Sequence, residues 1–122
     1  MTARGDSQVE VTPLKTHNGR PLRAGDSYAL SYVAALSIED LLAGRYIDSS
    51  EWYKRPIQSV KGEENLLPGL ESALADASFG DTLRVVVPAG LAFGRRGVPG
   101  RVAGDSKLYF QVEVIAVGDD QS

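Results

Sequence analysis

The chain has 122 residues, of which 43% are hydrophobic, and a formal net charge of −3. This length suits one domain with a small core, and such a charge gives no basic field that would attract nucleic acid or a membrane surface. The sequence has no cysteine, which excludes disulfides and thiolate chemistry. The start of the chain lacks the apolar segment of a secretory signal, and no apolar run approaches the ~18 residues of a membrane span, so we expect a cytoplasmic protein.

The first third of the chain predicts short strands joined by turns. A strand is expected at residues 9–12, before an Asn-Gly turn. Residues 27–36 alternate as a longer strand, because Tyr28, Leu30, Tyr32 and Ala34 fall on one face.

The next segment is less regular. In residues 37–44 the apolar positions have helical spacing and Ser37 is a possible cap, so a single helical turn and a loop both remain open. Residues 45–50 predict a strand, followed by a loop with the single tryptophan, Trp52, and a short strand at residues 56–60.

The clearest helix begins near Asn65, a plausible N-cap. Leu67, Leu70 and Leu74 recur at helical spacing, and Pro68 suits the first turn because its missing N–H removes no intrahelical bond. This is the one convincing helix that the pattern predicts.

The last third of the chain predicts two strands around a long loop. Residues 82–87 and 107–117 alternate as strands, and the glycine-rich, basic stretch 89–106 between them is long enough to indicate a functional loop. The predicted fold class is therefore α+β, with five to six mostly antiparallel strands and one short helix on a face of the sheet. We expect flexible tails at residues 1–8 and 118–122 around a single domain at residues 9–117.

The residue types needed for common catalytic chemistries are scarce. His17 is the single histidine and lies in a predicted turn, so we expect neither a histidine base nor a metal site. The glycine-rich loop matches neither common phosphate-binding pattern, and no cofactor is predicted.

Six segments, in the same order and spacing, resemble the FKBP-type peptidyl-prolyl isomerase family. The most specific are YIDSS, which resembles the family's F-D-S-S, and LAFGRRG, which resembles its Y-A-Y-G-x-x-G loop. The six segments are residues 26–32 (DSYALSY), 46–50 (YIDSS), 66–74 (LLPGLESAL), 79–87 (FGDTLRVVV), 91–97 (LAFGRRG) and 108–114 (LYFQVEV).

The resemblance implies that the sheet wraps around the short helix, and that a hydrophobic pocket between them isomerises Xaa-Pro bonds. It implies proline-containing peptides or proteins as partners, with weak binding of macrolide-type ligands. For catalysis the resemblance implies that the Tyr32 hydroxyl orients Asp48 and that the Leu67 N–H donates a hydrogen bond to a substrate carbonyl. Phe93 would occupy the family's ligand-contacting position on the loop beside the pocket. The residues implied to bind the substrate are Ile47, Ile57, Leu66, Leu70, Val102 and Phe110.

Several positions depart from the family's pattern. Leu70 replaces a pocket-floor tryptophan, Phe93 replaces a ligand-binding tyrosine, and Ile47 and Ile57 replace aromatic residues. These changes reduce the surface on which a proline ring can stack, so we expect reduced activity. The segment 37–44 is longer than in the family's short form, and we expect it to overhang the pocket.

Two alternatives to an isomerase remain open. The fold could hold a peptide or partner protein without catalysis, because four aromatic positions of the pocket are changed. The pocket could also serve another small molecule, since Arg95, Arg96 and Arg101 in the adjacent loop could recognise an anion.

Overall fold

The computed structural model describes residues 8–15, 19–63 and 66–117. Its elements, in chain order, are β1 (Glu10–Lys15), β2 (Ser27–Ala35), α2 (Ile38–Ala43), β3 (Asp48–Ser49), the 3₁₀ helix η1 (Ser50–Tyr53), β4 (Ile57–Val60), α3 (Pro68–Ala73), β5 (Thr82–Val87), the 3₁₀ helix η2 (Ala89–Leu91) and β6 (Leu108–Ala116). The predictions for His17 and Asn65, and those for the two tails apart from Gln8, concern residues outside the described ranges.

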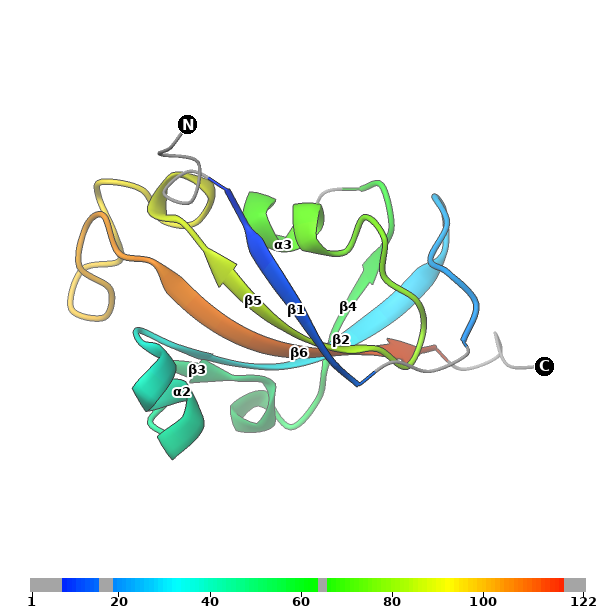
Figure 1. Ribbon diagram of the computed structural model, residues 1–122, viewed down its shortest axis with the longest axis horizontal. Coiled ribbons are helices and arrows are strands. Elements are labelled where there is room, and N and C mark those ends of the chain that lie inside the picture. Colours follow the sequence, from blue (N-terminus) through cyan, green and yellow to red (C-terminus); the bar gives the residue numbers. More distant parts are fainter. Residues whose placement is uncertain (1–7, 16–18, 64–65, 118–122) are drawn as a thin grey trace.

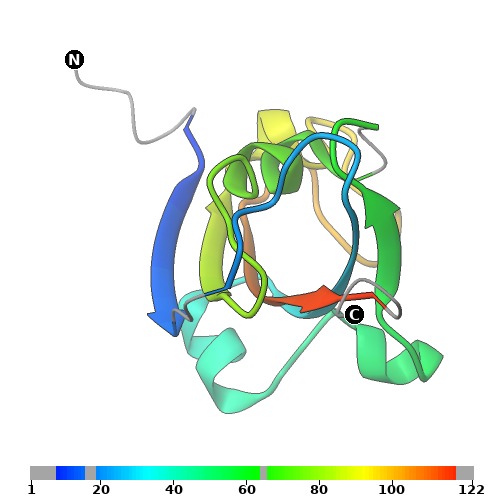
Figure 2. The ribbon, with the colours of Figure 1, turned by 90° about the vertical axis from the view of Figure 1, so that its right-hand side faces the viewer.

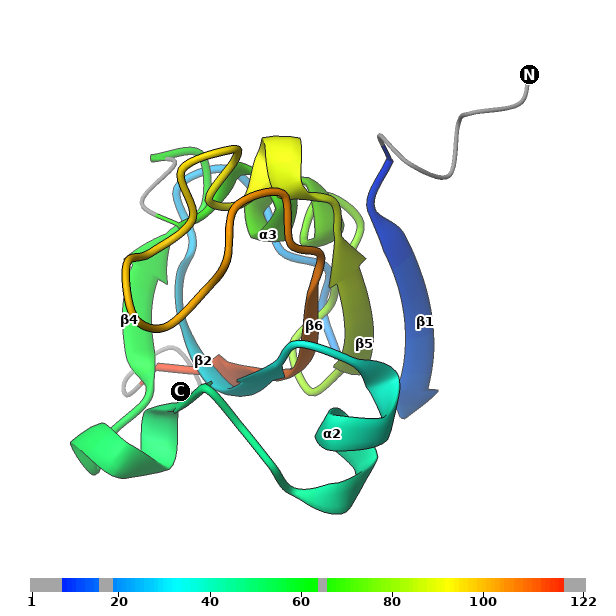
Figure 3. The same cartoon turned by 90° about the vertical axis from the view of Figure 1, so that its left-hand side faces the viewer.

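The strands form one antiparallel sheet in the order β1-β5-β6-β2-β3, with β4 also paired to β2. Figure 1 shows α3 on one side of this sheet and α2 on the other. Viewed from the ends in Figures 2 and 3, the sheet curls into an incomplete ring and α3 lies across its open side. The predicted α+β fold, an antiparallel sheet wrapped around a short helix, is confirmed.

The core lies between the concave face of the sheet and α3. Three residues of the predicted inward face of β2, Tyr28, Leu30 and Ala34, are buried there. Ala29 and Ala35 on the opposite face are buried as well, because α2 packs on that side of β2, so burial along this strand does not alternate. The alternating residues of β5 and β6 bury their apolar side chains in the same core. The two strands therefore form a continuous apolar wall with β2.

The segment 37–44 forms a helix on the outer face of the sheet. Its N-cap is Ser37, whose hydroxyl accepts a hydrogen bond from the Asp40 N–H at 3.0 Å. Gly44 ends the helix in the left-handed conformation with φ +80°, which costs glycine little because it has no Cβ. The helix contacts β2 and β6, and its Leu41 is buried. None of its residues lines the cavity, so the expectation that the segment overhangs the pocket is wrong.

The predicted helix exists but starts later and is shorter than the sequence pattern suggests. The N-cap of the helix is Leu67, and Leu74 is its C-cap. Gly69 allows close packing, because a Cβ there would lie 2.3 Å from Cγ1 of Val87 on β5. The contact with the sheet, rather than a capping side chain, therefore fixes the position of α3.

Two predicted boundaries in the middle of the chain are wrong. The strand expected at residues 45–50 is reduced to Asp48–Ser49, and the loop expected around Trp52 is the 3₁₀ helix η1. The cause lies in the serine side chains: Ser49 caps η1 by accepting a hydrogen bond from the Glu51 N–H, which turns the backbone away from the strand direction.

Candidate active site

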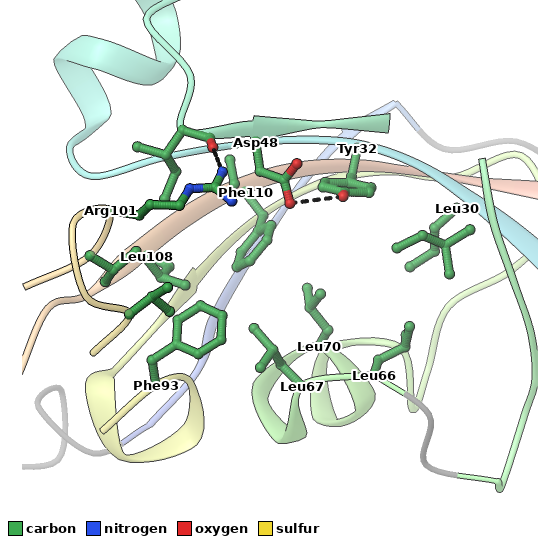
Figure 4. A pocket seen from close by; sticks show the side chains of 15 residues that line it. Leu30, Tyr32, Asp48, Leu66, Leu67, Leu70, Phe93, Arg101, Leu108 and Phe110 are labelled. Carbon is green, nitrogen blue, oxygen red and sulfur yellow. Dashed lines mark hydrogen bonds between the residues drawn. The ribbon is translucent and has the colours of Figure 1, made fainter. Parts of the chain in front are cut away.

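A cavity of about 350 Å³ lies between α3 and the concave face of the sheet. All ten predicted site residues line it, as do five others that the sequence analysis did not assign to it. Figure 4 shows Leu70 of α3, with Leu66 and Leu67 just before that helix, on one side of an open space. Tyr32, Asp48 and Phe110 lie on the other side. The additional residues are Leu30, Ala34, Val98, Arg101 and Leu108.

The floor of the cavity comes from the start of α3. Leu66, Leu67 and Leu70 line it, and Leu70 is buried in the core. The Glu71 side chain turns back and accepts a hydrogen bond from the Leu66 N–H at 2.9 Å. Among the described residues, no hydrogen-bond acceptor contacts the Leu67 N–H, which therefore remains a donor for a ligand at the position that the resemblance implied.

The polar side of the cavity is organised by the segment Asp48-Ser49-Ser50. Asp48 Oδ1 accepts a hydrogen bond from the Ser49 N–H at 2.8 Å. Ser50 Oγ accepts one from the Tyr32 N–H at 3.0 Å and donates one to the Tyr32 carbonyl at 3.3 Å. These bonds tie the segment to the middle of β2 and hold the Asp48 carboxylate at the rim of the cavity.

Asp48 accepts hydrogen bonds from two tyrosine hydroxyls. The Tyr32 hydroxyl donates to Oδ2 at 3.0 Å, and the Tyr53 hydroxyl donates to Oδ1 at 3.2 Å. Burial raises the pKa of Tyr32, and the adjacent Asp48 carboxylate raises it further. The Tyr32 hydroxyl is therefore a hydrogen-bond donor over the whole neutral range.

Tyr53 is a residue of this network that the sequence analysis missed. It ends η1, the 3₁₀ helix that Ser49 caps, and this turn brings residue 53 back towards Asp48. A 3₁₀ turn of four residues leaves no periodic signal in the sequence. The one local signal for this turn in the sequence is Ser49, a residue type that commonly caps helices.

The remaining wall and mouth are formed by the loop between η2 and β6. Phe93 is 38% exposed at the entrance, whereas Val102 is buried. The loop is compact, since Val98 and Val102 exchange two backbone hydrogen bonds of 2.8 Å. Gly97 allows this folding, because a Cβ there would lie 2.2 Å from the Val102 carbonyl oxygen and its φ is +64°.

Within the described ranges, no group of three or more histidine, cysteine, aspartate or glutamate side chains could hold a metal ion. In the same part of the chain, no helix is long and apolar enough to cross a lipid bilayer.

The sequence profile of the FKBP-type peptidyl-prolyl cis-trans isomerase family matches residues 19–115. This protein therefore belongs to that family, as the resemblance predicted. The match runs from the turn before β2 nearly to the end of β6, so it includes every residue that lines the cavity.

Individual relatives agree with this assignment. The chain is 35% identical over 97 residues to peptidyl-prolyl cis-trans isomerase FKBP11 of Bos taurus, with 80% of this chain and 45% of that protein covered. It is 28% identical over 118 residues to FK506-binding protein 1 of Debaryomyces hansenii, with 96% and 99% covered. The chain thus spans less than half the length of the bovine relative and nearly all of the yeast one.

A solved structure shares the fold. The crystal structure of a peptidyl-prolyl cis-trans isomerase from Pseudomonas syringae pv. tomato superposes with a TM-score of 0.72 at 25% identity, covering 91% of this chain and 76% of that one.

Proposed function

We propose that this protein catalyses the cis–trans isomerisation of Xaa-Pro bonds in the cavity beneath α3. The observation that carries the proposal is the convergence of the ten predicted residues on one open cavity, which has apolar walls and a Tyr32–Asp48 hydrogen bond at its rim. Family membership supports the same activity.

The reaction requires little covalent chemistry from the protein. Rotation about a peptide bond is opposed by a barrier of about 18–20 kcal/mol, because the amide resonance is lost. The cis and trans forms of an Xaa-Pro bond differ by only about 0.5–1 kcal/mol, so catalysis concerns the barrier. The twisted amide has less charge on its oxygen than the planar one, and an apolar site that excludes water favours it in relative terms.

The polar groups at the rim then fix the substrate. In this proposal the proline ring enters over Leu70, and the Leu67 N–H donates a hydrogen bond to a carbonyl of the substrate. The Asp48 carboxylate, held by the Tyr32 hydroxyl, lies beside the amide that rotates. Holding both ends of the bond in place lowers the entropy lost on reaching the twisted geometry.

The proposed activity is lower than in relatives with a fully aromatic pocket. An aromatic side chain buries about 150–250 Å² of surface, more than a leucine at position 70 can offer to a proline ring. Phe93 has no hydroxyl, and one missing hydrogen bond weakens binding by about 0.5–1.5 kcal/mol. The same changes support the proposal that macrolide-type ligands bind weakly.

The proposed partners are proline-containing peptides or proteins, whose proline matches the apolar cavity. A cytoplasmic location stays a prediction from the sequence. A role in protein folding likewise remains part of the proposal.

Exchange spectroscopy by NMR on a short Xaa-Pro peptide tests the activity directly. We expect faster cis–trans exchange when the protein is added, and a loss of about tenfold or more in Asp48→Ala, because a hydrogen bond to a charged group contributes about 1.5–3 kcal/mol. Asp40→Ala is the matched control, since Asp40 lies on α2 and its carboxylate pairs with Arg45 away from the cavity. No acceleration at high protein concentration would refute the proposal.

A peptide-binding module without catalysis is the second candidate. The changed aromatic positions, Leu70 above all, favour it, because the cavity still encloses a proline ring but offers it less stacking surface than an aromatic pocket. Binding of a proline-containing peptide without any change in its exchange rate would support this candidate against the first.

A further inference from the structure

Arg101 places a positive charge at the mouth of an otherwise apolar cavity. Its side chain lines the cavity together with Asp48 and Phe93, and it is exposed to solvent. The neighbouring Val102 is buried in the cavity wall, so residue 101 is anchored by the packing of the next residue. Figure 4 shows the Arg101 side chain extending from the loop towards the strand that carries Asp48.

The guanidinium group is held in place by a backbone contact. Nη2 donates a hydrogen bond to the carbonyl of Ile47, the residue immediately before Asp48. The loop that carries Arg101 is itself fixed by the paired hydrogen bonds between Val98 and Val102. The charge is therefore positioned before a ligand arrives, which lowers the entropy lost on binding.

Most of the hydrogen-bonding capacity of Arg101 is unused. A guanidinium has five N–H donors, and in the described part of the chain the only acceptor for them is the Ile47 carbonyl. The ion pairs among these residues are Arg20–Asp26 and Arg45–Asp40, and neither involves Arg101. The nearby Asp48 carboxylate is instead engaged by two tyrosine hydroxyls and a backbone N–H.

The positive charge of Arg101 influences the polar groups of the cavity. Burial is the main cause of the raised pKa of Tyr32, and the charge of Arg101 acts in the opposite direction, which places the guanidinium within electrostatic reach of the site. The protein as a whole carries a net charge of −3, so its overall field repels an acidic peptide. Any preference for acidic ligands must therefore come from a local group.

We propose that Arg101 makes the site selective for Xaa-Pro segments in which the residue before the proline carries a carboxylate. The inference rests on the proposed function for the position of the proline ring, and it adds the substrate class. A planar guanidinium can bind a carboxylate through two parallel hydrogen bonds, which an amide of the same shape cannot match. Arg101 is then a specificity-determining residue that acts on the flanking side chain rather than on the rotating bond.

Three peptides that differ only before the proline, with Glu, Gln or Lys at that position, provide the test. Dissociation constants are measured by NMR titration, and exchange rates are measured on the same samples. For the natural protein we expect the Glu peptide to bind about two- to fivefold more tightly than the Gln peptide at low salt, the range of an exposed ion pair. The Lys peptide should bind most weakly, and the preference should decline at high salt.

Three variants assign the effect to the side chain. Arg101→Gln should bind the Glu and Gln peptides equally, and Arg101→Lys should keep part of the preference because it keeps the charge. Arg96→Gln is the matched control, since Arg96 is an exposed arginine of the same loop that does not line the cavity. It should keep the full preference.

Equal affinity of the natural protein for the Glu and Gln peptides would overturn the inference, as would a preference that survives in Arg101→Gln. The absence of binding to all three peptides would overturn it as well. The proposed function is judged separately, by the exchange rates: a Glu preference in binding without acceleration of any peptide would refute catalysis and leave the role of Arg101 intact.

Discussion

The helices α2 and α3 have six residues each and lie on opposite faces of one sheet, but different interactions hold them. The caps of α2 are local: the Ser37 hydroxyl at its start and the left-handed Gly44 at its end. Among the described residues, no side chain caps the N-terminus of α3. Just beyond its C-terminal end, the Lys61 ammonium donates a hydrogen bond to the Ala75 carbonyl at 2.8 Å.

The difference follows from what each helix covers. One side chain of α2, Leu41, is buried against the outer face of the sheet. In α3, by contrast, Gly69, Leu70 and Ala73 are all buried, and the helix still leaves a cavity beneath its first turn. A helix that is held by the rest of the fold can present its N-terminal turn to a ligand, because local caps are not needed to keep it in place.

Two glycine substitutions, one in each helix region, test whether α2 and α3 are held by different interactions. Gly69→Ala should destabilise the protein by about 1–3 kcal/mol and weaken peptide binding, because the new methyl group collides with the fully buried Val87 and displaces α3. Gly44→Ala should lower the free energy of unfolding by about 1 kcal/mol, owing to its positive φ, and leave peptide binding unchanged. Urea denaturation and peptide titration measure both effects.

The double variant Gly69→Ala/Val87→Ala provides the control for the collision. The loss for the pair should be smaller than the sum of the two single losses, because the shorter side chain at position 87 makes room for the methyl group. Additive losses would show that Gly69 acts in another way.

The variant Leu70→Trp tests whether residue 70 forms the floor on which the proline ring lies. The cavity of about 350 Å³ can accept part of the indole, which then offers a flat surface to the proline ring. We expect proline-containing peptides to bind more tightly, up to about tenfold, since an aromatic contact contributes about 0.5–1.5 kcal/mol beyond its buried area. Titration of one peptide against both proteins measures the change, and weaker binding by a folded variant would contradict a floor at residue 70.

Tyr53 connects η1 to the rim of the cavity, and its removal tests the outer support of Asp48. Tyr53→Phe should lower the isomerisation rate about two- to fivefold, because one of the two tyrosine hydroxyls on the carboxylate is lost at an exposed position. Tyr32→Phe should have a larger effect, since the Tyr32 hydroxyl is less exposed. Tyr46→Phe is the control, and an equal loss in this variant would contradict the role of Tyr53.

The smallest expected effect is that of pH on the rate. Since burial raises the pKa of Tyr32, we expect a constant isomerisation rate between about pH 6 and 9. The folded protein retains this proton above pH ~10, where an unfolded tyrosine loses it, so stability is complete below that pH and falls above it.

Tyr32→Phe should reduce this alkaline loss of unfolding free energy, but only in part. Burial also raises the pKa of Tyr28, which is 1% exposed and contributes in the same direction. A rate that changes steeply near neutral pH would contradict a Tyr32 hydroxyl that stays protonated.

The regular part of the fold could be predicted from the sequence because its signals are periodic. The strands β5 and β6 alternate clearly, and Tyr32 on β2 and Phe110 on β6 followed from their positions in the family's pattern. Leu30, Ala34 and Leu108 lie on the same strands but were not assigned to the cavity. Arg101 and Tyr53 were not assigned to the site, because their positions depend on how the loop and η1 fold back. The short β3 was overestimated for a related reason: Ser49 and Ser50 use their side chains to end the strand.

The edge strand β1 affects whether two copies of this protein can associate through their sheets. All six of its residues are exposed, and among the described strands it pairs with β5 alone, so within this part of the chain its outer side is open to a strand from a second molecule. Pro13 has no N–H to donate to such a strand, and the pairing with β5 shifts register between Pro13 and Lys15. A proline, a shift of register and a lysine charge interrupt the regular ladder that a foreign strand would need, and such features protect an exposed edge from pairing with other molecules.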